Sequence, residues 1–183
     1  MHLAALMKGK GAVIATFDQE RRRHETALRL RRGGYHNVST RLWDGRHAPG
    51  KMASFDGVVV DAVCSGVGSW RRHPDARWVI SASQIASLAA EQLQILDTAG
   101  AGVRPGGTLV YSALTVTRTE TIDVVSQFLA AHPEFSLQPC PHPLDEATTQ
   151  GTLQLWPHIH DGDARFIAKM VRSTGVATPP GEG

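Results

Sequence analysis

An apolar run that ends in an acidic residue constrains this chain more than any other feature. Residues 55–68 read FDGVVVDAVCSGVG, with three consecutive valines at 58–60 directly before Asp61. Consecutive β-branched residues are typical of a strand that is buried on both faces, so we expect such a strand here. Asp61 then lies at its carboxyl end, where ligands bind in open α/β sheets. The cysteine, serine and glycine at 64–66 therefore indicate a site.

An ordinary strand-to-loop exit is the alternative interpretation of the same residues. In that case Cys64 is a small buried hydrophobe, which is a common role for a free cysteine. Cys64 and Cys140 are the two cysteines of the chain, too few for a disulfide framework. We recognise no signal peptide and no long apolar span, so we expect a cytoplasmic protein outside the membrane, with Cys64 as a free thiol.

Two further short runs that are typical of strands are also followed by acids. Residues 12–17 lead directly to Asp18, and residues 38–42 lead to Asp44. Both runs have the length and composition of short strands. An acid at the carboxyl end of such a strand can bind ribose hydroxyls.

Helical patterns separate these runs, so the chain alternates between helices and strands. We expect helices over 2–7, 19–32, 83–99 and 121–131, strands over 108–112 and 135–137, a loop over 139–149, and a terminal antiparallel hairpin from 153–156 and 165–171. This order is typical of the α/β class. A chain of 183 residues without a long linker favours one domain. Residues 173–183 are rich in proline and glycine, so we expect a disordered tail there.

Several longer motifs carry a specific resemblance to a known family. The motifs are DAVCSGVGSWRRHPDARW at 61–78, the segment 84–96, VRPGGTLVYS at 103–112 and PHIHDGD at 157–163. Together they resemble the Sun/Fmu family of RNA cytosine-5 methyltransferases, which act on ribosomal or transfer RNA and have the pattern Asp-Ala-Pro-Cys-Ser-Gly in the first motif. The resemblance covers nearly all of residues 2–172. It implies a partial catalytic domain over 1–172 with the class I methyltransferase fold, a Rossmann-like doubly wound sheet that ends in an antiparallel hairpin.

The resemblance implies that S-adenosylmethionine is the cofactor and indicates which residues bind it. The matching positions are Asp18 for the ribose, Arg23 one helical turn later, Asp44 near the adenine, and Asp61 beside the methionine moiety and the target base. In the family a first strand and a loop of pattern Asp-x-Cys-Ala-x-Pro-Gly-Gly-Lys-Thr come before the helix expected at 2–7. A glycine loop lets backbone amides approach a ligand closely. We therefore expect an N-terminally truncated domain that lacks this strand and loop.

The missing strand would be the central one, between the strand that ends at Asp18 and the strand that ends at Asp61. Its absence predicts two apolar edges, at 12–17 and 57–60, that carry no charge or proline to prevent further pairing. We therefore expect self-association through these edges.

The catalytic motifs depart from the family pattern at the nucleophile. Cytosine carbon 5 reacts only after a cysteine thiolate has added to carbon 6. In the family this cysteine lies in Tyr-Ser-Thr-Cys-Thr, and the cysteine of the Pro-Cys motif assists product release. Residues 111–115 read YSALT, so Leu114 stands in place of the nucleophile, and Val63 stands where proline is expected. Leucine has no ionisable group and cannot form the adduct.

We therefore expect Cys64 and Asp61 to be the remaining catalytic residues of an impaired enzyme. Attack by Cys64 itself is an alternative, because enzymes that methylate cytosine in DNA use the equivalent cysteine. A family segment Asn-Pro-Glu-Glu-Asn is reduced to TRTET at 117–121, where Glu120 alone matches. The rival from another class is a non-catalytic remnant that binds RNA or a protein partner.

Basic and aromatic side chains near these motifs are candidates for RNA contacts. The resemblance suggests that Arg71, Arg72 and Lys169 contact RNA phosphates, although ordinary surface charge is the alternative. A net charge of +2 is too small to indicate nucleic-acid binding by itself. Trp70 and Trp78 have two interpretations: stacking on a flipped base, or packing beneath a loop, the more common role.

The histidines and acids of the PHIHDGD motif also suggest metal ligands at first sight. These residues are His158, His160, Asp161 and Asp163. In the family this stretch instead shapes the edge of the cleft that faces RNA. We therefore expect no metal site.

Overall fold

The computed structural model describes residues 1–47, 51–144 and 147–175. The chain forms two compact units, Met1–Pro49 and Gly50–Gly183. Residues 176–183 of the expected disordered tail lie outside the described residues. The assignment of 1–172 to one methyltransferase domain stays a prediction.

The first unit is a β-α-β unit preceded by a short helix. Its elements are α1 (His2–Leu6), β1 (Val13–Phe17), α2 (Glu20–Arg32) and β2 (Val38–Leu42). The strands β1 and β2 pair in parallel, and Phe17 lies opposite Leu42 at their carboxyl ends. Arginines in the last turn of α2 suit the negative end of the helix dipole. These bounds agree with the expected elements to within two residues.

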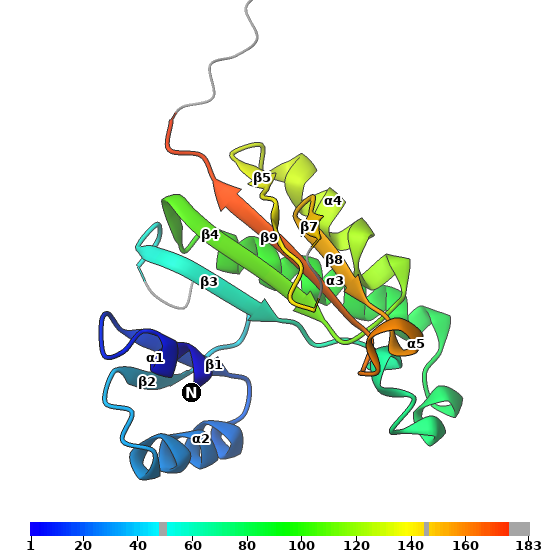
Figure 1. Cartoon of the computed structure of the whole chain (residues 1–183), viewed down its shortest axis with the longest axis horizontal. Coiled ribbons are helices and arrows are strands. Elements are labelled where there is room, and N and C mark those ends of the chain that lie inside the picture. The colour runs from blue at the N-terminus through cyan, green and yellow to red at the C-terminus, as the bar shows by residue number, and fades with distance from the viewer. Residues whose placement is uncertain (48–50, 145–146, 176–183) are drawn as a thin grey trace, which may run out of the picture. The chain divides into compact units, whose positions relative to one another are not determined.

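The second unit is built on a mixed sheet (Figure 1). The strand order is β3 (Phe55–Asp61), β4 (Val103–Ala113), β9 (Arg165–Arg172) and β5 (Phe135–Leu137). β3 and β4 are parallel, whereas β9 is antiparallel to both β4 and β5. β8 (Thr152–Leu155) also pairs with β9, which confirms the expected terminal hairpin.

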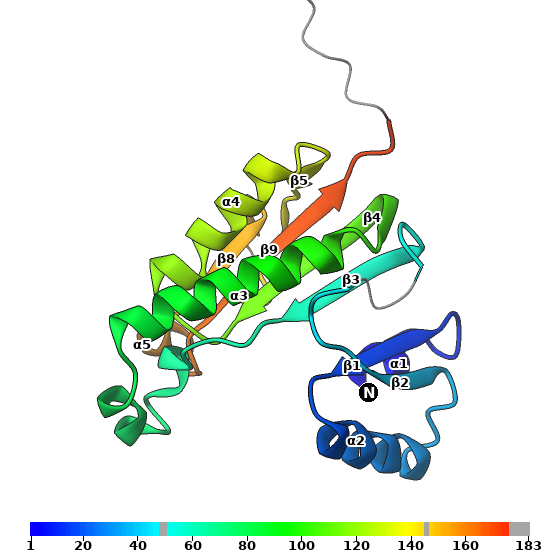
Figure 2. The same cartoon turned by 180° about the vertical axis from the view of Figure 1, so that it is seen from behind.

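Two helices cover one face of this sheet, α3 (Ala82–Gly100) and α4 (Ile122–Ala131) (Figure 2). α3 begins with a capping box, in which the Ser81 side chain and the Gln84 side chain each bond the other residue's backbone N–H. Leu96, Leu109 and Phe128 are completely buried between the helices and the sheet. The remaining short helices are η1 (Val67–Ser69), η2 (Pro74–Trp78), η3 (Arg118–Glu120) and α5 (Pro157–His160).

The prediction that β3 is buried on both faces was wrong at one position. Val60 is 6% exposed and pairs with Tyr111 on the face that α3 covers, whereas Val59 is 55% exposed. Successive strand residues point to opposite faces, so only one face of β3 packs under the helices of its unit.

The prediction of a loop over 139–149 was also partly wrong. β6 (Cys140–Pro141) and β7 (Thr148–Thr149) form a short antiparallel ribbon around residues 145–146, which lie outside the described residues. The Thr149 hydroxyl donates to the Cys140 carbonyl at 3.2 Å and stabilises this pairing. No helix in the part of the chain that the structure describes is long and apolar enough to cross a membrane.

Candidate functional site

Asp18 and Asp44 lie together at the carboxyl end of the two-stranded sheet. Their strands end in register, and the backbone N–H of Trp43 donates to the Phe17 carbonyl at 2.9 Å. The two acids line one surface hollow with Leu42 and Trp43. The structure therefore brings together two of the predicted cofactor ligands and adds Trp43, which sequence reasoning missed although it stands directly before Asp44.

The two carboxylates differ in their surroundings. Asp18 Oδ1 is 3.6 Å from Arg22 Nη1, and both side chains are exposed, so this ion pair is weak. Asp44 accepts hydrogen bonds from the Arg46 N–H at 2.9 Å and from the His47 ring, and the Arg46 amide chiefly lowers the pKa of Asp44. Asp44 is therefore ionised at neutral pH, and Asp18 has the freer oxygens.

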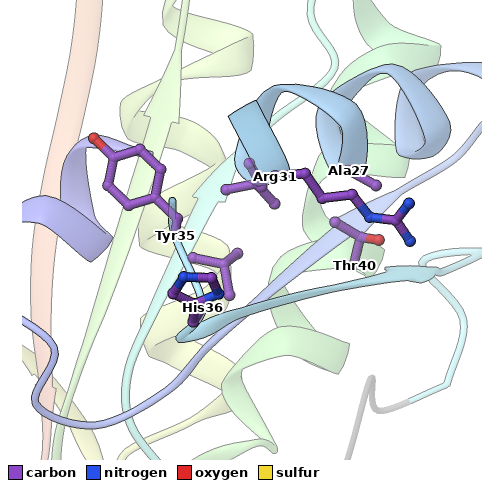
Figure 3. Close-up of a pocket in the computed structure, with 7 residues that line it drawn as sticks. Ala27, Arg31, Tyr35, His36 and Thr40 are labelled. Atoms are coloured by element: carbon purple, nitrogen blue, oxygen red, sulfur yellow. The ribbon is translucent and has the colours of Figure 1, made fainter. Parts of the chain in front are cut away.

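Arg23 is not among the residues that line this hollow. Its Nε donates to Glu20 Oε2 at 2.8 Å, and its Nη1 reaches the Thr40 hydroxyl at 3.5 Å. The hydrogen bond from Arg23 is the main reason why the pKa of Glu20 is lowered. A second hollow between α2 and β2, lined in part by Arg31, Tyr35 and His36, contains none of the predicted site residues (Figure 3).

Asp61 lies at the carboxyl end of β3, as predicted. Its Oδ1 accepts a 2.8 Å hydrogen bond from Arg165 Nη1, and the same nitrogen donates to the Ser112 hydroxyl at 2.7 Å. Asp61 is paired in register with Ser112, so adjacent strand ends present these groups. The Asp61 side chain remains 70% exposed, which leaves it open to a ligand. Arg165 was missed, because only the pairing of β9 with β4 brings it to this edge.

Cys64 follows β3 by three residues and is half-buried. Gly66 has φ 70°, a conformation that glycine adopts without strain and that turns the chain after the cysteine. Burial raises the pKa of the Cys64 thiol, and the charges of Glu120 and Asp61 raise it further, against hydrogen bonds from the Gly66 and Leu114 amides. The thiol is therefore protonated at neutral pH. Position 114, which the resemblance assigns to the nucleophile, therefore has its backbone directly beside Cys64.

Gly68 joins the two loops that flank this contact. Its N–H donates to the Leu114 carbonyl at 3.0 Å, and its carbonyl accepts from the Ala164 N–H at 2.9 Å. A Cβ at this position would lie 2.1 Å from the Ala164 carbonyl oxygen. Only glycine permits this close approach of three backbone segments.

A buried polar network lies directly behind Cys64. At its centre is Glu120, whose side chain is completely buried and accepts hydrogen bonds from Ser65, Gln92, Thr115 and Thr117. Burial alone raises the pKa of Glu120, but the hydrogen bonds from Ser65, Thr117 and Thr115 outweigh it, and the net effect lowers the pKa. The Tyr111 hydroxyl lies 2.7 Å from the Glu120 carbonyl, and burial raises the pKa of Tyr111. Sequence reasoning noted Glu120 only as a family match.

The three residues predicted to contact RNA lie in different surroundings. Arg71 Nη1 donates to Asp161 at 3.2 Å, and Arg72 Nε donates to both oxygens of Asp163 at 3.0 Å. These ion pairs connect the segment after η1 to the residues that follow α5. Lys169 lies on β9, in register with Val110 of β4.

The two tryptophans near these arginines also differ. Trp78 is 85% exposed, so packing beneath a loop is wrong for this residue. Trp70 is half-buried, and its indole N–H has no hydrogen-bond partner within the described ranges. Across residues 1–47, 51–144 and 147–175, no three His, Cys, Asp or Glu side chains are grouped closely enough to hold a metal ion.

The sheet of the second unit has parallel β3 and β4 followed by antiparallel β9, with Asp61 at the end of β3. This is the class I methyltransferase arrangement. Solved structures share it. The protein described as NSun6 from Pyrococcus horikoshii with SFG, an analogue of S-adenosylmethionine, is 25% identical with a TM-score of 0.80, over 96% of this chain and 44% of that one. A methyltransferase homolog from the same organism is 26% identical with a TM-score of 0.77, over 93% of this chain and 56% of that one.

The family model described as 16S rRNA methyltransferase RsmB/F matches residues 1–171, and the chain belongs to this family. Ribosomal RNA small subunit methyltransferase F of Cronobacter sakazakii is 34% identical over 97% of this chain. The corresponding methyltransferase B of Thermus thermophilus is 39% identical over 76% of this chain. The chain spans 38% and 35% of the lengths of these two relatives. Members of this family methylate ribosomal RNA with S-adenosylmethionine.

Proposed function

We propose that this chain is part of an RNA cytosine-5 methyltransferase whose own catalysis is impaired. The observation that carries the proposal is the position of Leu114, whose backbone amide lies close enough to the Cys64 thiol to lower its pKa. The family mechanism requires a cysteine at each of positions 64 and 114, and in this chain position 114 is a leucine. The relatives' names support ribosomal RNA as the substrate, with transfer RNA as the other class that the resemblance includes.

The cofactor proposed is S-adenosylmethionine, which supplies an electrophilic methyl group when bound. Asp18 and Asp44 suit the ribose and adenine, because carboxylate oxygens accept hydrogen bonds from hydroxyl and amino groups. Leu42 and Trp43 give their hollow the apolar surface that an adenine ring requires. Arg23 is proposed as a supporting residue through its ion pair with Glu20.

Asp61 is proposed to bind both the methionine moiety and the target base. Its exposed carboxylate is oriented by Arg165, so it can accept hydrogen bonds from an amino group without moving. This is the role that the resemblance assigns to the strand-end acid.

The chemistry on the base explains why Leu114 matters. A thiolate must form a bond to cytosine carbon 6, which pushes electrons to carbon 5; after methyl transfer, a base removes the carbon 5 proton and the carbon–sulfur bond breaks. Leu114 can take no part in the first step. Cys64 is the remaining cysteine of the pair that the family mechanism uses. Its raised pKa makes it a weak nucleophile at neutral pH but a suitable participant in proton transfer during product release.

RNA phosphates are proposed to contact Arg71, Arg72 and Lys169. The ion pairs with Asp161 and Asp163 hold the two arginines in fixed orientations but also reduce their net attraction for phosphate. We therefore assign them a positioning contribution rather than most of the affinity. A cytoplasmic location is proposed, where ribosomal RNA is found.

A covalent trapping experiment tests the proposal. RNA that contains 5-fluorocytidine forms a stable adduct with such enzymes, because the fluorine at carbon 5 cannot leave as a proton does. With this chain and S-adenosylmethionine we expect no adduct on a denaturing gel. An adduct that disappears in Cys64→Ser would show that Cys64 attacks instead, and would overturn the assignment of a lost nucleophile. A catalytically active relative on the same RNA is the positive control.

The second candidate function is a non-catalytic module that binds RNA or a partner, and Leu114 favours it as well. Retained RNA affinity without methyl transfer, in a filter-binding assay, would support this candidate. We also propose self-association through the edges of β1 and β3 that pair with no strand in the described parts of the chain.

A further inference from the structure

The residues on either side of Cys64 are held by one buried network. On one side, Gln92 Nε2 donates to the Val63 carbonyl at 2.7 Å. On the other side, the Ser65 N–H and hydroxyl donate to Glu120 at 2.7 and 2.5 Å. Gln92 Nε2 also reaches Glu120 at 3.1 Å, so both anchors meet at one carboxylate.

The same carboxylate also holds the segment that follows β4. The hydroxyls of Thr115 and Thr117 donate to Glu120 Oε2 at 2.9 and 2.8 Å. Glu120 therefore connects the loop that carries Cys64 to the loop that carries Leu114. These are the two positions at which the proposed mechanism places its cysteines.

This arrangement connects two loops in addition to stabilising the fold. Glu120 is completely buried, and no Lys, Arg or His side chain forms an ion pair with it in the described ranges. Burying a charge without a cation is costly, but the hydrogen bonds from Ser65, Thr117 and Thr115 outweigh that cost, and the pKa of Glu120 is lowered. An apolar residue here would leave the loops unconnected and would leave the donors of Ser65, Thr115 and Thr117 without this acceptor.

We propose that Glu120 is a positioning residue that fixes Cys64 relative to position 114. It acts through Ser65 on one side of the cysteine, and through Gln92 and the Val63 carbonyl on the other. The inference rests on the proposed function only in treating Cys64 as the reactive group of the site.

The negative charge of Glu120 also influences the thiol directly. The charged groups near the sulfur are Glu120 and Asp61, and both raise the pKa of Cys64 in addition to the effect of burial. Removing the charge of Glu120 should therefore lower this pKa, whereas removing the whole side chain should also release the loop. These two effects can be separated by the choice of substituent.

Glu120→Gln changes the charge and keeps the connections. Oε1 accepts from the Ser65 N–H and the Gln92 amide, which can only donate, whereas Oε2 accepts from three hydroxyls. A glutamine can keep its oxygen at the first position and donate its amide to hydroxyls, which also accept hydrogen bonds. Glu120→Ala removes every connection.

The experiment measures alkylation of Cys64 by iodoacetamide as a function of pH in a Cys140→Ser background, by intact mass. Asp123→Asn is the matched control, because Asp123 is an exposed carboxylate just beyond η3 that binds Arg118 instead of the network. Glu120→Gln is expected to lower the midpoint pH while the limiting rate stays within about twofold, since the thiolate remains equally accessible. Glu120→Ala is expected to raise the limiting rate about tenfold, because loss of charge-assisted hydrogen bonds favours local opening. The control should match the parent.

The proposal is overturned if Glu120→Ala is folded by circular dichroism and its profile superimposes on the parent's. If Glu120→Ala does not fold, Glu120→Gln and Ser65→Ala decide. Ser65→Ala removes the hydroxyl anchor and should raise the limiting rate, and unchanged profiles in both variants would refute the proposal. The assay requires no methyl transfer, so its failure leaves the proposed function standing, and an active chain would leave this inference intact.

Discussion

Gly68→Ala should destabilise the second unit and disturb its site. The new Cβ would lie 2.1 Å from the Ala164 carbonyl oxygen, 2.8 Å from the Leu114 carbonyl carbon and 2.9 Å from the Leu114 oxygen. All three are backbone atoms, which cannot move aside as the end of a flexible side chain can. Relief of the contact requires the loops around Gly68 to separate.

The size of the effect follows from the contacts that this separation breaks. Two backbone hydrogen bonds connect Gly68 to Leu114 and Ala164, at 3.0 and 2.9 Å. Loss of each costs about 0.5–1.5 kcal/mol, and overpacking strain adds about 1–3 kcal/mol. We therefore expect the free energy of unfolding to fall by about 2–6 kcal/mol, a large effect for one methyl group.

Urea unfolding followed by circular dichroism measures this change, with Gly162→Ala as the control. The nearest atom to a Cβ at Gly162 is the His160 carbonyl oxygen at 3.7 Å, an ordinary contact. The control should shift the free energy of unfolding by less than about 0.5 kcal/mol. Equal midpoints for the two variants would refute the close approach at Gly68.

Three further outcomes are expected. Calorimetry should give a dissociation constant for S-adenosylmethionine weaker than about 10 μM, because only four residues line the hollow at Asp18 and Asp44. Asp18→Ala should abolish the residual binding, whereas the control Glu25→Ala should not. Tighter binding by the parent would contradict this. Sedimentation should show self-association that Val59→Lys reduces, since charge on an edge strand opposes pairing, whereas a purely monomeric parent would refute it. Because the pKa of Glu120 is lowered in the folded protein, its ionisation stabilises the fold at pH values above the ordinary glutamate pKa of 4.5, and this stability is lost as the pH falls through the lower folded pKa. The difference in the free energy of unfolding between Glu120→Gln and the parent should therefore shrink in that acidic range. A constant difference from neutral pH to acid would contradict this.

Local sequence patterns predicted the strand ends well. Asp18, Asp44 and Asp61 each follow a run predicted to be a strand, and each lies at the carboxyl end of a strand. The hairpin of β8 and β9 was also predicted, because alternation along both strands is a local signal. The predicted fold class agrees with the solved relatives.

The remaining errors concern interactions between residues that are distant in the chain. Gln92 is a polar residue of the helix predicted over 83–99, yet it is buried, where Tyr111 and Glu120, 19 and 28 residues away, bind its amide. Arg165 reaches Asp61 across 104 residues. The exposure of Val59 depends on which face of β3 the helices cover. No periodicity within a short window records such contacts, because tertiary pairing determines them.

The most direct test of the account is formation of 5-methylcytidine. The purified chain is incubated with S-adenosylmethionine and unmodified small-subunit ribosomal RNA, and the digested nucleosides are analysed by mass spectrometry beside an active relative. The account predicts 5-methylcytidine with the relative and none with this chain, because Leu114 cannot attack carbon 6 of cytosine. Formation of 5-methylcytidine by this chain would contradict it.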